Sequence, residues 1–180
     1  MFPEIRFTRF TEKWQERTLG DLCNITTGKL DANAMQESGR FDFYTSGIKK
    51  YKIDYAAFEG PAITIAGNGA TVGFMHIADG KFNAYQRTYV LYELNENREF
   101  LFYAIGKVLP LKIKLEARAG NIPYIVRDML TDLKIVLPSK DEQKRIAKFF
   151  TNLDLMISHQ QQELDKLKNL KKALLQKMFI

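Results

Sequence analysis

The sequence predicts an α+β protein in which a mixed, largely antiparallel β domain over residues 1–138 is followed by one long coiled-coil helix over residues 139–180. Two observations predict this architecture. Short apolar segments separated by glycine turns fill residues 61–94, which is typical of antiparallel strands. Apolar residues then recur at alternating spacings of three and four from residue 146 onward, which is typical of a helix that pairs with another helix.

The N-terminal third is predicted to alternate irregular segments with short regular elements. Residues 1–17 carry scattered aromatic side chains and are expected to form an irregular arm. Thr18 and Asp21 have the spacing of a capping box, so a short helical turn is expected to begin there, before a strand over residues 24–29. Aromatic and polar residues alternate over residues 41–54, which predicts a hairpin.

The middle of the chain is the most β-like part. Strands are expected over residues 62–65, 71–77 and 88–92. The first turn between them, Gly67-Asn68-Gly69, is expected to need positive φ angles, which glycine adopts without steric cost. A second turn is expected at Ala78-Asp79-Gly80-Lys81.

The segment after the strands changes to helical spacing. A helix is predicted over residues 95–109, and Pro110 is expected to end or kink it because proline lacks the backbone N–H that the helix ladder uses. A second helical turn is possible after it. A short helix over residues 126–133 and a final strand over residues 134–138 complete the predicted domain.

The long helix is expected to begin after Pro138, where Ser139 and Glu142 have capping-box spacing. At 1.5 Å per residue it would extend roughly 60 Å, more than the width of the domain. Gln160 and Lys171 interrupt its apolar stripe. The stripe favours pairing with a partner helix, and the alternative is a terminal helix folded back on its own domain. The predicted pairing residues are Ile146, Phe150, Leu153, Ile157, Leu164, Leu167, Leu174 and Met178.

Composition excludes several classes of protein. The longest apolar runs are too short to span a membrane, and no secretory segment follows Met1. A single cysteine, Cys23, excludes an internal disulfide and a cysteine-based metal cluster, and it fits the reducing cytoplasm where we expect the protein to act. Its apolar neighbours predict that Cys23 is a small buried hydrophobe.

Catalytic motifs are absent, so no catalytic residue, metal ligand or cofactor site is predicted. The glycines near residue 67 lack the spacing of a phosphate loop or a dinucleotide fingerprint. His76 and His159 are far apart in the sequence, and we expect the first to be structural and the second solvated. A metal-dependent nuclease that uses Glu142 and Lys144 is the enzymatic alternative, but the capping box explains Glu142 more simply. The sequence therefore favours a recognition or scaffold protein.

Charge and polar loops indicate double-stranded DNA as a partner without establishing it. The net charge is +6, and the last 42 residues hold nine basic and five acidic side chains. Lysine and arginine contact phosphates, whereas amides and arginine contact base edges. The phosphate candidates are Lys29, Lys49, Lys50 and Arg118. The candidates for base edges or loop support are Asn33, Tyr44, Gln86, Arg87 and Asn121.

Several segments spread over nearly the whole chain resemble one known family. The most specific is Leu137-Pro138 followed by Glu142-Gln143 and Ile146 at the start of the heptad helix. The other matching segments are Leu19-Gly20-Asp21, Ile25-Thr26-Thr27-Gly28-Lys29, Gly67-Asn68-Gly69-Ala70-Thr71-Val72-Gly73, Phe82-Asn83-Ala84-Tyr85-Gln86-Arg87-Thr88-Tyr89, Gly120-Asn121-Ile122-Pro123, and Leu167 to Phe179. The chain resembles the DNA specificity subunit of type I restriction–modification systems.

The resemblance implies a function and a set of partners. In that family a target-recognition domain reads one half of a split DNA site, and a full subunit carries two such domains, each followed by a helix. The two helices pair antiparallel as a spacer. The subunit recruits methyltransferase subunits and then restriction subunits, and it is not catalytic. S-adenosylmethionine is expected on the methyltransferase partner, so this chain itself is expected to need no cofactor.

The chain departs from the family pattern because it has one recognition domain and one helix. It is expected to be either an excised half or a natural half-subunit that pairs with itself. Self-pairing by two-fold symmetry predicts a palindromic split target, whereas a different second half predicts an asymmetric one. The runner-up hypothesis is a coiled-coil interaction protein that does not contact DNA.

Overall fold

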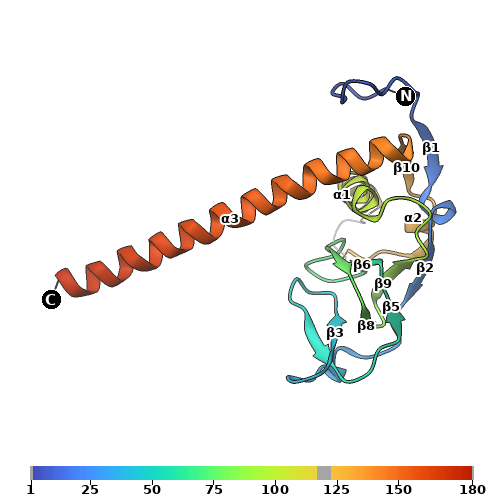
Figure 1. The fold of residues 1–180 in the computed structure, drawn as a ribbon. Coiled ribbons are helices and arrows are strands. Elements are labelled where there is room, and N and C mark those ends of the chain that lie inside the picture. The colour runs from blue at the N-terminus through green and yellow to red at the C-terminus, as the bar shows by residue number, and fades with distance from the viewer. Residues whose placement is uncertain (1, 117–122, 180) are drawn as a thin grey trace.

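The structure is a computed structural model that describes residues 2–116 and 123–179, and it shows a β-rich domain from which one long helix projects (Figure 1). The elements, in chain order, are β1 (Gln15–Thr18), η1 (Leu19–Asp21), β2 (Asn24–Thr27), η2 (Ala32–Ala34), β3 (Phe41–Tyr44), β4 (Tyr51–Ile53), β5 (Phe58–Glu59), β6 (Ala62–Ala66), β7 (Met75–Ala78), β8 (Lys81–Ala84), β9 (Thr88–Tyr92), α1 (Arg98–Glu116), α2 (Arg127–Thr131), β10 (Lys134–Leu137) and α3 (Lys140–Met178).

The strands form two four-stranded sheets and one two-stranded sheet. The strand order is β2-β9-β6-β7 in the first sheet and β4-β3-β8-β5 in the second, while β1 pairs with β10. Among the pairings of the described strands, only β3 with β8 is parallel. The predicted α+β class with a largely antiparallel domain and a long C-terminal helix is therefore confirmed, as is the hairpin formed by β3 and β4.

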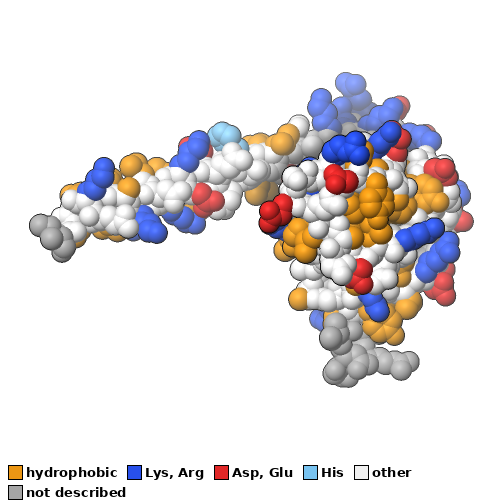
Figure 2. Space-filling view, turned by 90° about the horizontal axis from the view of Figure 1, so that it is seen from below, with side chains coloured by type: hydrophobic (Ala, Val, Ile, Leu, Met, Phe, Trp, Pro, Cys, Tyr) orange, Lys and Arg blue, Asp and Glu red, His pale blue; other side chains and the backbone are white. Residues whose placement is uncertain are grey.

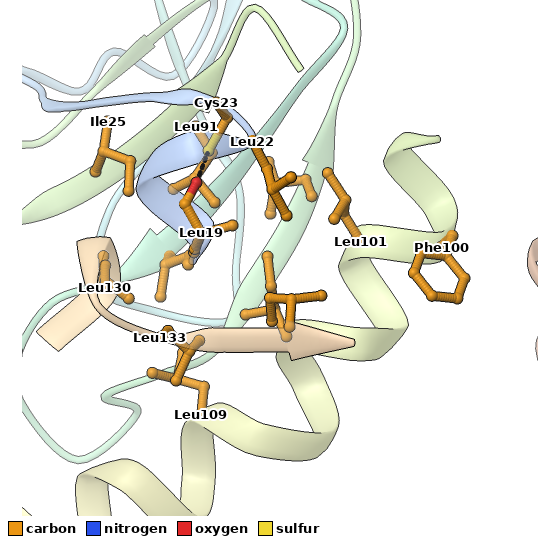
Figure 3. Close-up of a cluster of buried hydrophobic side chains, with 14 of the residues drawn as sticks. Leu19, Leu22, Cys23, Ile25, Leu91, Phe100, Leu101, Leu109, Leu130 and Leu133 are labelled. Atoms are coloured by element: carbon orange, nitrogen blue, oxygen red, sulfur yellow. Dashed lines mark hydrogen bonds between the residues drawn. The ribbon is translucent and has the colours of Figure 1, made fainter. Parts of the chain in front are cut away.

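The main hydrophobic core lies between the first sheet, α1, α2 and β10. Leu19 of η1 and Leu101 of α1 are completely buried in it (Figure 3). Cys23 is also buried, as predicted, and its thiol donates a hydrogen bond to the carbonyl oxygen of Leu19 at 3.5 Å. Burial raises the pKa of Cys23 to about 12, so the thiol stays protonated and unreactive.

A smaller core joins the two four-stranded sheets. It contains Tyr44 and Phe82 from the second sheet and Val90 from the first. The rings of Tyr44 and Phe82 pack edge to face with 5.4 Å between their centroids. The two sheets are therefore held face to face, which fixes the loops at their ends relative to one another.

Turn chemistry explains where the predicted boundaries hold and where they do not. The carboxylate of Asp21 accepts hydrogen bonds from the backbone and side chain of Thr18, as the capping-box spacing predicts, and η1 follows. The return strand β7 begins later than expected because Gly69 and Gly73 both have positive φ, at +86° and +83°. A Cβ on Gly73 would lie 2.7 Å from Ile113 of α1, so this loop packs closely on the helix.

Helix α1 continues through Pro110 to Glu116, so the prediction that this proline could end the helix is wrong. Proline removes one hydrogen bond from the helix ladder. The burial of Leu109, and the packing of Ile113 against the same core, hold the helix together on either side of the proline.

The base of α3 is embedded in the domain. Gln143 is buried, and its amide donates to Glu96 at 2.8 Å and to the carbonyl oxygen of Pro138 at 3.0 Å. Tyr103 of α1 donates to the carboxylate of Asp154 at 2.6 Å. After that residue nearly every side chain of α3 is exposed, and Figure 1 shows the helix leaving the domain. The alternative in which the helix folds back on its own domain is therefore wrong.

No helix within residues 2–116 or 123–179 combines the length and the apolar character needed to cross a bilayer.

Candidate nucleic-acid interface and pairing helix

Five segments far apart in sequence form a loop cluster at one end of the sheets: residues 28–30, 44–50, 67–74, 85–88 and 123–125. Backbone hydrogen bonds tie them together. The N–H of Gln86 donates to Leu30 at 2.8 Å, and the N–H of Gly67 donates to Arg87 at 2.8 Å. Further bonds join Tyr85 to Tyr44 at 2.9 Å and Ile125 to Gly67 at 2.7 Å. These loops are therefore held in a defined arrangement.

Two glycines allow the loop cluster to pack this closely. A Cβ on Gly28 would lie 1.8 Å from the carbonyl oxygen of Ala84, and one on Gly67 would lie 2.4 Å from that of Arg87. Neither distance is possible for a real side chain. Both glycines belong to sequence segments that carried the family resemblance, and their role is the close approach of backbone to backbone.

Six of the predicted DNA-contact residues are exposed, and most belong to the loop cluster. Lys29, Gln86 and Arg87 lie on two neighbouring loops, because Leu30 and Tyr85 form a bridge between them. Lys49 and Lys50 lie at the tip of the β3–β4 hairpin. This tip joins the same cluster because the hydroxyl of Ser46 donates to the side chain of Asn68 at 2.8 Å. The sixth, Asn33, is exposed in the separate turn η2.

The charges of the loop cluster are largely uncompensated. Lys50 lies 4.0 Å from a carboxylate oxygen of Asp42, which also pairs with Lys52 at 2.8 Å. Within the described part of the chain, no salt bridge engages Lys29, Lys49 or Arg87. These three cations are therefore available to an anionic partner such as a phosphate.

One predicted contact residue is corrected by the structure, and two lie outside it. Tyr44 is 1% exposed in β3, where its ring packs on Phe82 and lies 5.2 Å from the ring of His76. It cannot reach a base without unfolding the small core, so we remove it from the contact set. Arg118 and Asn121 fall outside the described residues.

Sequence reasoning missed two polar or aromatic side chains of the loop cluster. Asn68 had been assigned only to a turn, although it bonds Ser46 and forms a bridge with Tyr124. Tyr124 is 59% exposed. Its position beside the Gly120–Pro123 segment of the resemblance was the available signal. An exposed aromatic ring next to basic loops is suited to contacts with nucleic acid.

His76 has the structural role that the sequence predicted. Its ring lies between Phe74 and Tyr44, and Nε2 is 3.4 Å from the carbonyl oxygen of Gly47. Burial lowers the pKa of His76, so the ring is neutral near pH 7. His159 is exposed on α3, also as expected.

Glu142 has a different role from the one its spacing predicted. Its carboxylate accepts two hydrogen bonds from Arg6, from Nε at 2.8 Å and from Nη2 at 2.7 Å, and the Ser139 side chain makes no capping bond. The capping-box prediction is therefore wrong, and this ion pair fastens the N-terminal arm to the base of α3. Lys144 pairs instead with Asp141 at 3.8 Å. The geometry gives no support to a nuclease site at Glu142 and Lys144.

The predicted pairing stripe is exposed along α3. Phe150 and Leu153 are 42% and 37% exposed near the domain, and Leu167 and Met178 reach 62% and 72% farther out. Figure 2 shows hydrophobic side chains along the helix among lysines and arginines. Such a continuous apolar surface on an isolated helix is unusual for a monomer and marks an interaction site. The full stripe also includes Ile146, Ile157, Leu164 and Leu174.

Comparison with known protein families gives a match to the family model described as "Type I restriction modification DNA specificity domain", over residues 11–169. The chain is 40% identical to the type I restriction enzyme EcoDI specificity subunit of Escherichia coli, over 74% of this chain and 30% of that protein. It is 25% identical to the MjaVIII specificity subunit of Methanocaldococcus jannaschii, over 99% of this chain and 44% of that protein. The chain thus spans less than half the length of these relatives.

Solved structures have the same fold. The S subunit of a type I restriction-modification system from M. genitalium superposes with a TM-score of 0.71 and 24% identity, covering 93% of this chain and 46% of the other. The HsdS subunit from Thermoanaerobacter tengcongensis gives a TM-score of 0.62 and 19% identity, covering 99% and 47%. Because the family model matches most of the chain, from the β domain well into α3, the chain belongs to the type I restriction-modification DNA specificity family.

Proposed function

We propose that this chain is a recognition module that reads one half of a bipartite DNA target for a type I restriction–modification complex. The observation that carries the proposal is the loop cluster, in which hydrogen-bonded loops present Lys29, Gln86 and Arg87 side by side at an exposed end of the sheets. A preorganised basic surface of this kind binds DNA without paying the entropy of ordering its loops.

The side chains of the loop cluster divide by chemistry. Lys29, Lys49 and Lys50 carry compact charges suited to phosphate oxygens, and they would position the domain on the duplex. Gln86 can make two hydrogen bonds to adenine, and Arg87 can make two to guanine. Arg87 is the stronger candidate for base reading because its backbone is fixed by the bond from Gly67, while its side chain is exposed.

The long helix is proposed to set the distance between two such modules. With 39 residues it is about 58 Å long at 1.5 Å per residue. The exposed stripe supports antiparallel pairing, either with a second copy of this chain or with another specificity half. The methyltransferase and restriction subunits are proposed to bind this assembly, with S-adenosylmethionine on the methyltransferase. The chain itself is proposed to be non-catalytic and to act in the cytoplasm.

Fluorescence anisotropy tests the proposal. Labelled duplex DNA is titrated with the chain plus its cognate methyltransferase subunit, and the salt dependence is recorded. We expect tight binding by the complex that weakens as salt rises, and a lower salt slope for Lys29→Ala. Lys166→Ala, on the far part of α3, is the matched control and should leave the slope unchanged. Absence of binding by the complex at low salt would refute DNA recognition.

The exposed stripe favours a second candidate, a coiled-coil interaction protein that does not contact DNA. The same titration separates the two. The scaffold function predicts that the chain adds nothing to the DNA affinity of the methyltransferase subunit and that Arg87→Ala has no effect. DNA recognition predicts that the chain determines which sequences are bound.

A further inference from the structure

An open, mostly apolar groove lies at the base of α3, between the N-terminal arm and α1. Its volume is about 860 Å³. Phe7 of the arm, Tyr103 and Val108 of α1, and Phe149 and Phe150 of α3 line it. The rings of Phe7 and Phe149 meet edge to face at 5.9 Å, and those of Tyr103 and Phe150 lie 5.2 Å apart. The groove walls are therefore ordered by contacts between the three elements.

The groove is continuous with the pairing stripe. Ile146 and Phe150, the first two members of the stripe, line the groove. At the other end of α3, Leu174 and Met178 remain 48% and 72% exposed. A helix that lies along the stripe must therefore enter the groove at its domain end. If the partner is an identical antiparallel helix, the part that enters is its C-terminal end.

The domain limits the register of such a pair. Gln143 is three residues before Ile146 on the same face of α3, but it is 1% exposed and bonded within its own domain. No partner side chain can lie opposite it. Registers that keep the two stripes in contact differ by one heptad. The register that places Leu174 opposite Gln143 is therefore excluded, and the next one places Met178 opposite Ile146.

This register gives the longest overlap that the domain allows, about 50 Å between Ile146 and Met178 at 1.5 Å per residue. It places Phe150 opposite Leu174. It also brings Asp154, which flanks the stripe, within one turn of Lys168 on the partner helix. Opposite charges at flanking positions stabilise a coiled-coil register, and by symmetry this pair occurs twice.

We propose that the groove is the docking site for the C-terminal end of α3 from a second copy of this chain. Met178 packs against Ile146, and Phe179, which is 72% exposed, extends toward the arm. The inference rests on the proposed self-pairing and adds its register and its end point. The arm, held by Arg6 and Glu142, then forms one wall of the dimer interface.

Disulfide trapping tests the register. In the proposed register Ile157 of one copy lies opposite Leu167 of the other, so I157C/L167C should give a covalent dimer on mild oxidation. The matched variant L153C/L164C reports the register one heptad away, where the first pair would be displaced by roughly 10 Å, beyond the reach of a disulfide. It should remain uncrosslinked. The wild type, with only the buried Cys23, is the background control.

A second measurement tests the groove itself. Trp14, the single tryptophan, lines the groove, so its emission reports docking. Dilution of the wild type through its dimer dissociation constant should shift the emission to longer wavelength. Met178→Asp should raise that constant roughly 100-fold, because two methionines lose their burial in each dimer. Gln176→Asp, on the opposite face of the same helix end, should change it by less than about threefold.

The outcomes separate this inference from the proposed function. A wild type that sediments as a monomer at all concentrations would overturn self-pairing and the inference together. A dimer in which L153C/L164C crosslinks and I157C/L167C does not would overturn the register and leave self-pairing intact. Equal effects of Met178→Asp and Gln176→Asp, with unchanged Trp14 emission on dilution, would overturn docking in the groove.

Discussion

Replacing Arg6 by alanine should destabilise the protein far more than its position in an irregular arm suggests. The guanidinium makes two charged hydrogen bonds to Glu142, at 2.8 and 2.7 Å, and the side chain of Glu142 is 1% exposed. Removing one partner of a buried pair leaves an uncompensated charge and costs about 3–5 kcal/mol. Arg6 is 14% exposed, so water can partly replace it, and we expect about 3 kcal/mol.

Urea unfolding at a fixed protein concentration measures this cost. Arg17→Ala is the matched control, because Arg17 is 53% exposed, lies 3.9 Å from Asp21, and should contribute less than about 1 kcal/mol. A double-mutant cycle with Glu142→Gln should show strong coupling between Arg6 and Glu142. If Arg6→Ala costs no more than Arg17→Ala, the arm is not fastened to α3 as described.

Three further predictions concern protonation and DNA binding. Burial lowers the pKa of His76 from 6.5, so the unfolded chain binds the proton more readily. The free energy of unfolding should therefore fall as pH drops below about 6.5, less so in His76→Gln but unchanged in His159→Gln. Cys23, with a pKa of about 12, should react with a thiol reagent only after unfolding, as followed by mass spectrometry. Arg87→Ala should weaken cognate DNA by about 1–3 kcal/mol and relax one base position, whereas Lys29→Ala should weaken all sequences alike, as measured by anisotropy.

The elements that local sequence could predict are those whose pattern repeats. The heptad stripe placed the long helix at residues 139–180, and α3 runs from Lys140 to Met178. The β-like stretch gave β6, β7 and β9, because alternation and glycine turns are properties of neighbouring residues. The start of β7 was misplaced because the conformations of Gly69 and Gly73 depend on packing against α1.

Interactions between distant residues could not be predicted. Glu142 has the spacing of a capping residue, yet its partner Arg6 lies 136 positions away. Tyr44 lies among basic residues and resembled a DNA contact, but the pairing of β3 with β8 turns it into the core. The candidate site followed the same rule. The exposed loop residues Lys29, Gln86 and Arg87 were found from their chemistry, whereas their proximity depends on the bridge between two loops.

Mapping of methylated adenines tests the central claim most directly. A plasmid library is exposed in cells to this chain together with its methyltransferase subunit, and modified sites are sequenced. The account predicts methylation at one split target with two half-sites, palindromic if the chain pairs with itself, and an altered base preference in both halves for Arg87→Ala. Methylation that is absent, or unchanged when the chain is omitted, would contradict it.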